Sequence, residues 1–230
     1  MSIRDLQGCV EDLIPVNNVL ASVSDKTGLD FFIPALVRIN PKIRFLSTGG
    51  TYNKIKEILG NPSKDTLLEV AEYTGFPEME GGLVKTLHPK VHAGILGERG
   101  NPKHQRYLQE ELKGAVFIDM AIVNLYPFVQ TISKPDVTFE KARGNIDVGG
   151  PTMMRAAAKN FPSCASVCDP EDYQDILSTI VKNNGCTTFN QRFALAPKVF
   201  EMTSAYDEMI AKYFRENNDP EKVRELYRLN

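Results

Sequence analysis

The chain has 230 residues and a mass of 25.7 kDa, which is enough for one large domain or a main domain with a small appendage. Its 42% hydrophobic and 24% charged residues are typical of a globular protein, and its net charge of −2 gives no reason to expect nucleic acid or membrane binding. No apolar run is long enough to span a bilayer, and the N-terminus lacks the apolar core of a signal peptide. A cytoplasmic protein is therefore expected.

The cysteine and histidine residues do not indicate a metal site. The four cysteines include no C-x-x-C pair, so neither a zinc site nor a disulfide framework is predicted. His88 and His92 are four residues apart, but Pro89 lies between them and no third ligand is evident. We therefore predict that the protein binds no metal.

Two units of strand, turn and helix come first in the chain. An apolar run at 18–23 leads into the turn S-D-K-T-G and a helical pattern at 29–39, and a strand at 42–46 leads into S-T-G-G-T and a helix at 52–59. Loops that follow parallel strands gather at one edge of a sheet, where hydroxyls, glycines and a lysine could hold a phosphate. Two ordinary polar turns with helix caps remain the alternative interpretation.

Regular patterns disappear after a third strand, which we expect at 66–71. Residues 73–96 are rich in glycine and proline as well as aliphatic residues, and a loop of this length inside a compact domain is usually functional. Lys85 stands between the apolar residues Val84 and Leu87. It could be a partly buried anion contact or an ordinary solvated lysine.

The second half of the chain continues the alternation of helices and strands. Tyr126 lies just past a strand end, at the edge where ligands bind, although an aromatic side chain would fit a core equally well. The pattern predicts an α/β fold with a mainly parallel sheet, helices on both faces and a C-terminal helical segment that is either continuous or interrupted at Pro197. Helices are expected at 101–113, 138–145, 170–183 and 188–217, and strands at 116–125 and 164–168.

The stretch N-I-D-V-G-G-P-T-M-M-R-A-A-A-K-N, residues 145–160, predicts a helix with exposed backbone at its beginning. Gly149 and Gly150 would let a ligand approach the unpaired N–H groups of the first turn. Asp147 and Lys159 add two groups that can exchange protons, but a helical rise of ~1.5 Å per residue separates the lysine from the glycines by about 12 Å. A folded-back loop or a second subunit would have to close this gap. An ordinary helix start with a solvated acid and lysine is the alternative.

Six motifs follow one another in the chain: S-V-S-D-K-T-G at 22–28, S-T-G-G-T at 47–51, T-G-F-P-E-M at 74–79, V-K-T-L-H-P-K-V-H-A-G-I-L at 84–96, N-L-Y-P-F at 124–128 and I-D-V-G-G-P-T-M-M-R-A-A-A-K-N at 146–160. Together they resemble the inosine monophosphate (IMP) cyclohydrolase domain of the bifunctional purine-biosynthesis enzyme, which joins it to an aminoimidazole-carboxamide ribonucleotide (AICAR) transformylase. The resemblance implies a methylglyoxal-synthase-like fold. It also implies the last step of purine biosynthesis, in which the formamido ribonucleotide FAICAR loses water and closes to IMP.

The resemblance further implies roles for individual residues. Contact with the reacting groups or proton transfer is implied for Lys85, Tyr126, Asp147 and Lys159, and which lysine donates a proton stays open. The reaction is a dehydration, so no redox cofactor or metal is expected. Substrate binding is implied for Ser22, Ser24, Lys26, Thr48, Gly49, Gly50, Thr51, Thr86 and Asn124 and for the backbone N–H groups of Val148 and Gly149.

Two departures from the family pattern affect these expectations. Leu83 stands where the family commonly has an arginine, which puts nucleotide affinity in doubt more than chemistry. The chain also ends at Asn230, about where the transformylase half would begin. Unless the sequence is a cut form, we expect a single-activity cyclohydrolase domain at 18–217, with an N-terminal extension at 1–17 and a tail at 218–230. We expect it to form homodimers and to receive FAICAR from a separate formylating enzyme.

Two other functions remain open at this point. A nucleotide-binding regulatory module would share the phosphate loops but would not need Lys85, Tyr126, Asp147 and Lys159 together. Methylglyoxal synthase acts on a triose phosphate, and release of methylglyoxal from dihydroxyacetone phosphate would identify it. The insertion at 73–96 and the helix at 149–160 resemble the cyclohydrolase branch instead.

Overall fold

Five short apolar runs pair in parallel to form the central sheet, in a computed structural model that describes residues 9–77, 79–217 and 219–228. The strand order is β4-β3-β2-β5-β6, so the chain winds outward on one side of β2 and then returns to its other side at β5. The connections that follow β2 and β5 therefore lead to opposite faces of the sheet, which leaves a crevice at the carboxyl ends of these strands. The strands are β2 (Asn18–Ser22), β3 (Arg44–Ser47), β4 (Leu67–Glu69), β5 (Met120–Val123) and β6 (Ala165–Val167).

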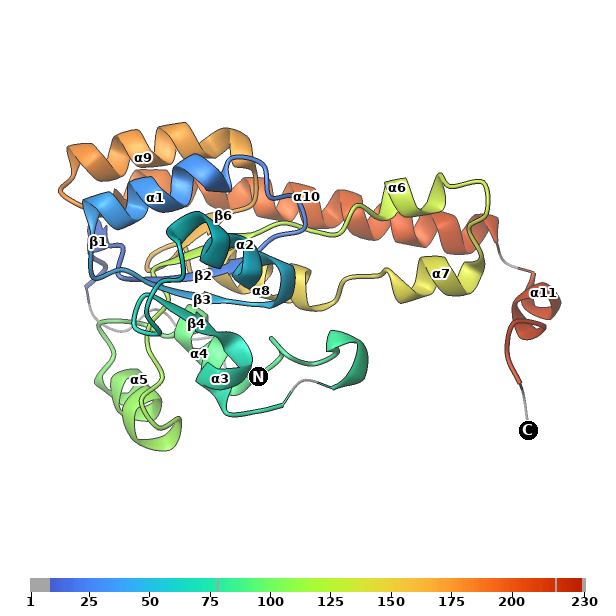
Figure 1. Cartoon of the computed structure of the whole chain (residues 1–230), viewed down its shortest axis with the longest axis horizontal. Helices are drawn as coiled ribbons and strands as arrows, with labels where there is room; N and C mark the ends of the chain where they lie inside the picture. Colours follow the sequence, from blue (N-terminus) through green and yellow to red (C-terminus); the bar gives the residue numbers. More distant parts are fainter. Residues whose placement is uncertain (1–8, 78, 218, 229–230) are drawn as a thin grey trace.

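Helices cover both faces of this sheet (Figure 1). Successive residues of a strand point to opposite faces, so Val19 and Ala21 belong to one buried apolar cluster and Leu20 belongs to the other. The predicted α/β fold is confirmed. The first cluster is covered by α1 (Leu29–Ile39), α2 (Gly49–Leu59) and α9 (Tyr173–Lys182), and the second by α3 (Val70–Thr74), α4 (Pro89–Leu96), α8 (Gly149–Lys159) and the first half of α10 (Phe189–Glu216).

Two segments differ from the sequence-based prediction, and for the C-terminal helical segment the structure decides between the two alternatives. The strand expected at 66–71 gives way after β4 to α3, and the expected loop at 73–96 ends in α4. Pro89 occupies the first position of α4, and the ring Nδ1 of His88 accepts the N–H of Lys90, so the proline that seemed to exclude a helix in fact begins one. The helix α10 continues through Pro197 because this residue lies on its exposed side, where solvent can hydrate the backbone.

The remaining elements are short. The expected helix at 101–113 consists of α5 (Pro102–Arg106) and a π-helical turn, η2 (Tyr107–Glu111). A 3-10 turn, η1 (Glu80–Gly82), lies in the loop before α4, and another, η3 (Pro170–Asp172), precedes α9. The last half of α10 extends beyond the sheet and is flanked by α6 (Phe128–Ile132) and α7 (Phe139–Gly144); we call these three segments the arm (Figure 1).

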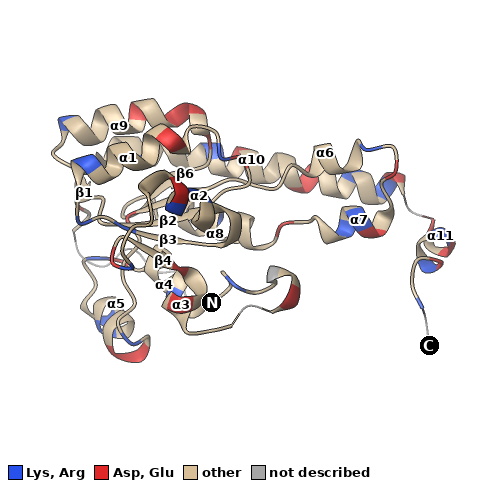
Figure 2. Ribbon diagram, viewed as in Figure 1, with Lys and Arg blue, Asp and Glu red and all other residues tan. Residues whose placement is uncertain are grey.

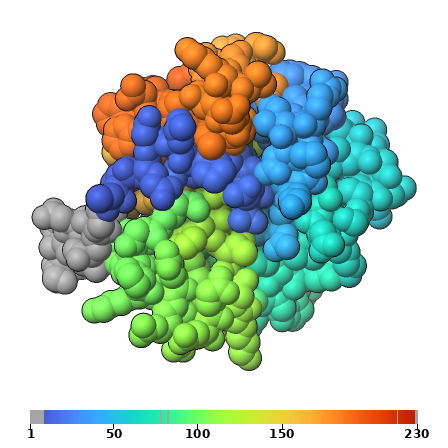
Figure 3. All heavy atoms as spheres, turned by 90° about the vertical axis from the view of Figure 1, so that its left-hand side faces the viewer, coloured from blue at the N-terminus to red at the C-terminus, as the bar shows by residue number. Residues whose placement is uncertain are grey.

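The two chain ends contribute further small elements. Strand β1 (Leu13–Pro15) pairs antiparallel with β7 (Cys186–Thr188), and neither strand was predicted. In the space-filling view the start of the described chain, in dark blue, lies between the orange segment that contains α9 and the green segment that contains α5 (Figure 3). Residues 1–8 of the expected extension, and residues 218, 229 and 230 of the expected tail, lie outside the described residues. The described tail contains α11 (Pro220–Arg224).

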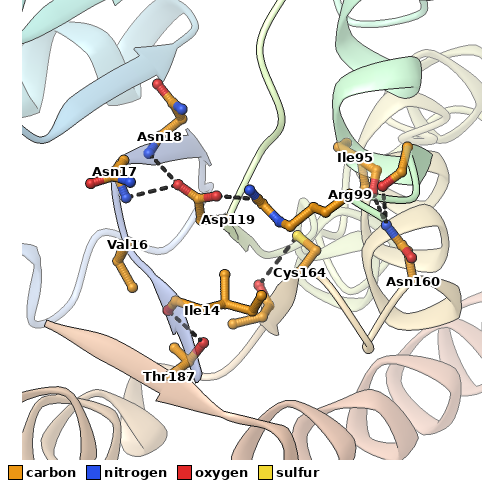
Figure 4. A network of polar contacts seen from close by, with 12 residues as sticks. Ile14, Val16, Asn17, Asn18, Ile95, Arg99, Asp119, Asn160, Cys164 and Thr187 are labelled. Carbon is orange, nitrogen blue, oxygen red and sulfur yellow. Dashed lines mark hydrogen bonds and ion pairs between the residues drawn. The ribbon is translucent and has the colours of Figure 1, made fainter. Parts of the chain in front are cut away.

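A polar network holds the edge of the sheet opposite the crevice (Figure 4). The buried carboxylate of Asp119 accepts the N–H groups of Asn17 and Asn18 at 2.7 and 2.6 Å and forms an ion pair with Arg99. The guanidinium of Arg192, which is fully buried, donates to the backbone carbonyl groups of five residues, Glu11, Asp12, Phe161, Pro162 and Thr187. These contacts fix the strand beginnings and leave the strand ends available for a site.

Neither charge sign dominates one region of the fold. Basic and acidic residues are interspersed along the outer helices, and the central strands carry almost none (Figure 2). Within the described ranges, no helix is both long and apolar enough to cross a membrane.

Candidate functional site

A cleft of about 740 Å³ opens at the carboxyl ends of β2, β3 and β5. This is the crevice that the strand order creates, and it collects loops from both halves of the chain. Of the residues that the sequence analysis proposed for the site, all except Lys159 line the cleft: Ser22, Ser24, Lys26, Thr48, Gly49, Gly50, Thr51, Lys85, Thr86, Asn124, Tyr126, Asp147, Val148 and Gly149.

One end of the cleft has the properties of a phosphate site. Helix α2 begins at Gly49, and within the described ranges the N–H groups of Gly49 and Gly50 have no hydrogen-bond partner. The Lys26 ammonium lies 3.7 Å from the place where a Cβ on Gly50 would be, and the Lys85 ammonium lies 3.3 Å from the corresponding place on Gly49. Two cations therefore flank the positive end of a helix dipole, an arrangement that favours an anion.

Hydroxyl groups lie beside these amides. The Oγ atoms of Ser22 and Thr48 are 3.1 Å apart, at the ends of adjacent strands. Gly49 has a φ of +48°, so its backbone adopts a left-handed conformation that favours glycine. The predicted phosphate loops thus meet at one place.

Thr51 and Asn124 shape the loop after β2. The Oγ1 of Thr51 accepts the N–H of Val23 at 2.9 Å and donates to its carbonyl oxygen at 3.0 Å. The Oδ1 of Asn124 accepts the N–H groups of Ser24 and Asp25 at 2.7 and 3.0 Å, and its Nδ2 donates to the Asp25 carbonyl at 2.9 Å. These side-chain groups are used by the protein itself, and their direct contact with a substrate stays a prediction.

Asp147 lines the cleft immediately before α8. Its Oδ1 accepts the N–H of Gly150 at 2.8 Å, and its own N–H donates to the hydroxyl of Tyr206 at 2.8 Å. Burial raises the pKa of the Asp147 carboxyl above its ordinary value, while hydrogen bonds from the Gly150, Gly149 and Tyr126 backbone act in the opposite direction. A carboxylate whose proton affinity is raised in this way suits a general base.

The first turn of α8 is closely packed on this carboxylate. A Cβ on Gly150 would lie 2.4 Å from Asp147 Oδ2, and a Cβ on Gly149 would lie 2.6 Å from the Oγ1 of Thr86. Both glycines are therefore required by their surroundings. The N–H of Val148 has no hydrogen-bond partner in the described part of the chain, so it is available to a ligand.

Apolar residues form the rim of the cleft. Tyr126 is 59% exposed and Val148 is 61% exposed, and Leu83 and Val84 are exposed on the loop that precedes α4. Val84 has a φ of +69°, a strained conformation for a β-branched residue, which is often found at functional sites. The sequence analysis did not propose the lining residues Met79, Val84 and Leu87 for the site, although all three lie in motifs that carry the family resemblance.

Lys159 does not line the cleft of its own chain. It is exposed at the C-terminal end of α8, ten residues from Gly149 and thus about 15 Å away along the helix. The Asn160 Nδ2, directly after this lysine, donates to the carbonyl of Ile95 at 2.6 Å. A role of Lys159 in the cleft stays a prediction.

The described residues also contain no group of three or more His, Cys, Asp and Glu side chains that could hold a metal ion. The functional groups of the cleft are instead ammonium groups, backbone amides, hydroxyls, a phenol and one carboxylate. This set can bind an anion, hold a polar ring and accept a proton.

Comparisons with known proteins give consistent matches. The MGS-like domain matches residues 29–152, and the AICARFT/IMPCHase bienzyme family matches residues 157–230. The bifunctional purine biosynthesis protein PurH of Chlorobium phaeobacteroides (strain BS1) is 45% identical over 210 residues, and that of Leptospira biflexa serovar Patoc (strain Patoc 1 / Ames) is 45% identical over 202 residues. These alignments cover 91% and 88% of this chain but only 38% of each relative. The crystal structure of ForH has a TM-score of 0.72 and 33% identity, and the match covers 86% of this chain and 98% of that chain.

Proposed function

Because this chain belongs to the family of MGS-like domains and is similar to the PurH proteins, we propose that it is an IMP cyclohydrolase that closes FAICAR to IMP and water. One observation carries the proposal: a single cleft contains both a helix N-terminus with the Lys26 ammonium beside it and a half-buried carboxylate at the start of α8. A purine ribonucleotide needs both, an anion contact for its phosphate and polar groups for its base.

The chemistry follows from this arrangement. The carboxamide nitrogen of FAICAR attacks the formyl carbon and forms the C–N bond of the ring, and Asp147 accepts the proton that this nitrogen loses. The former carbonyl oxygen becomes negatively charged, and the backbone N–H groups of Val148 and Gly149 stabilise it. This oxygen then gains two protons, which balance the one lost by the carboxamide nitrogen and one lost by the formamide nitrogen. Its bond to carbon breaks and it leaves as water while a C=N bond forms to the formamide nitrogen and the ring becomes aromatic. The net change is the loss of one water molecule.

The groups around the reacting atoms hold them in a reactive geometry. The phosphate binds at the start of α2 beside Lys26. Lys85 lies beside the reacting groups, and Thr86 and Tyr126 line the pocket beside the base. Lys85 or Lys159 protonates the departing oxygen. Since Lys159 is about 15 Å from Gly149 along α8, a role for Lys159 requires that a second copy of the chain supplies it.

The wider context belongs to the same proposal. A homodimer in the cytoplasm, a purine nucleotide as the small-molecule substrate and a separate enzyme that supplies the formyl group all stay predictions. The reaction is a dehydration, so the proposal includes neither a redox cofactor nor a metal.

The direct test is to add the purified protein to FAICAR without folate or metal and to measure IMP formation. We expect rapid turnover by the wild type and little by Asp147→Asn or Lys85→Ala. Tight binding of a purine monophosphate without turnover would contradict the proposal and favour a regulatory module. Release of methylglyoxal from dihydroxyacetone phosphate would contradict it in favour of a lyase.

A further inference from the structure

The arm of the molecule contacts the proposed site through the side chain of Tyr206. This residue lies on α10, beyond the sheet, and is only 3% exposed. Its ring packs edge-to-face on Phe128, at 6.2 Å between centroids and 72° between planes. With Phe128, Ala142 and Tyr213 it forms a small apolar cluster that is separate from the two clusters of the sheet.

The hydroxyl of Tyr206 accepts the N–H of Asp147 at 2.8 Å. The two residues are 59 positions apart, so this contact connects the arm to the segment between α7 and α8. The neighbouring residue Ile146 packs on the same apolar cluster. The segment that carries the carboxylate is thus held from the side of α10 by one hydrogen bond and one apolar contact.

Asp147 is therefore fixed at both of its ends. Its backbone is held by Tyr206, and its carboxylate is held by the N–H of Gly150 at 2.8 Å. If the backbone contact is lost, the part-buried N–H of Asp147 is left without an acceptor and the segment that carries the carboxylate is held less firmly, which destabilises the observed geometry. Small displacements of a reacting group cost large factors in rate.

We propose that Tyr206 is a positioning residue that holds the backbone of Asp147 and so places its carboxylate correctly at the start of α8. The proposal rests on the proposed function, because it assigns Asp147 a role in turnover. The chain offers a matched control in Tyr213, which lies on the same helix, in the same apolar cluster and with its ring edge-to-face against Phe128, but its hydroxyl does not contact Asp147.

The test compares Tyr206→Phe with Tyr213→Phe in the full chain. We expect Tyr206→Phe to lower kcat by about 10- to 100-fold with much smaller changes in KM and in the Kd of IMP, and Tyr213→Phe to leave kcat nearly unchanged. Amide hydrogen exchange provides a readout that does not depend on turnover. We expect the Asp147 N–H to exchange faster in Tyr206→Phe than in the wild type and in Tyr213→Phe.

The outcomes separate this proposal from the proposed function. Absence of IMP formation by the wild type would contradict the cyclohydrolase assignment, while the exchange rates would still decide whether Tyr206 holds Asp147. An Asp147 N–H that is equally protected in both variants would overturn the positioning role. An equal loss of kcat in both variants would also overturn it, because it would indicate a general effect on the packing of the arm.

Discussion

The carboxylate of Asp147 is in direct contact with Gly150, whose N–H donates to Oδ1 at 2.8 Å and whose missing side chain leaves the room that Oδ2 occupies. A Cβ at this position would lie 2.4 Å from Oδ2 and 2.9 Å from the side chain of Leu125. The glycine is therefore required by the acid beside it. This contact connects the local sequence I-D-V-G-G-P to the geometry of a reacting group.

Replacement of Gly150 by alanine should displace the Asp147 carboxylate. We expect kcat to fall by about 100-fold, because the reacting groups move out of alignment. Alanine is normally the better residue in a helix by ~1 kcal/mol, so helix propensity alone predicts a more stable protein. Steady-state kinetics and urea unfolding distinguish the two effects. A Gly150→Ala variant that is more stable than the wild type and equally active would show that the contact is unimportant.

Asp147→Asn should have opposite effects on activity and on stability. Without a base, kcat is expected to fall by about 10² to 10⁴. The acidic limb of the wild-type kcat/KM profile should lie above the ordinary aspartate pKa of about 3.9, because burial raises the pKa of Asp147 and the base must be ionised. A limb at or below the ordinary value would contradict the assignment.

The same raised pKa has a consequence for folding. The folded state resists ionisation of Asp147, so the contribution of this group to stability is fully present below the pKa of the unfolded chain and is lost as the pH rises through the raised folded pKa. Asn has no charge to bury, so Asp147→Asn should be more stable than the wild type at neutral pH, and the difference should shrink towards acidic pH. Urea unfolding at neutral and mildly acidic pH measures this, and a constant difference would contradict it.

Much of this site is predictable from the sequence because its signals are local. The loops around Lys26 and Gly49 follow apolar runs directly, and the glycines before α8 indicate a helix start with exposed amides. Contacts between distant segments give no such signal. For Tyr206 the sequence shows only that it belongs to the apolar face of a helix. Its contact with Asp147 depends on the path of α10 along the arm. The role of Asn124 in holding the loop at Ser24 likewise spans 100 positions.

Lys26→Ala should weaken the binding of the nucleotide phosphate. The Lys26 ammonium lies 3.7 Å from the place of a Cβ on Gly50, beside the free amides of α2. Loss of one charge-assisted hydrogen bond, worth about 1.5 to 3 kcal/mol, should raise KM by about 10- to 150-fold. Lys54→Ala is a suitable control, because Lys54 lies on α2 but forms an ion pair with Glu57 at the surface.

The Kd values of IMP and inosine give the decisive comparison for this lysine. Lys26→Ala should weaken IMP binding and leave inosine binding unchanged, because inosine has no phosphate. Lys54→Ala should change neither value. Equal weakening of both ligands by Lys26→Ala would show that the lysine shapes the loop rather than contacts the phosphate.

Lys159 should act in the cleft of a second copy of the chain if it acts in catalysis at all. It is exposed at the far end of α8, and α8 is a rigid spacer of about 15 Å between it and Gly149. In a symmetric dimer, a hybrid of Asp147→Asn and Lys159→Ala chains would contain one cleft with both wild-type groups. If the two variants mix at random in equal amounts, half of the dimers are hybrids. Each hybrid has one intact cleft out of two, so about a quarter of the wild-type activity should return.

The complementation experiment has an outcome for each arrangement. Each variant alone should be nearly inactive, and the two should be unfolded together, refolded as a mixture and assayed for IMP formation. Recovery of about a quarter of the activity requires that the lysine is shared between subunits. No recovery would show that both groups act within one chain, against the observed length of α8. An active Lys159→Ala variant would instead leave Lys85 as the proton donor, since it is then the only lysine of the proposed pair that remains.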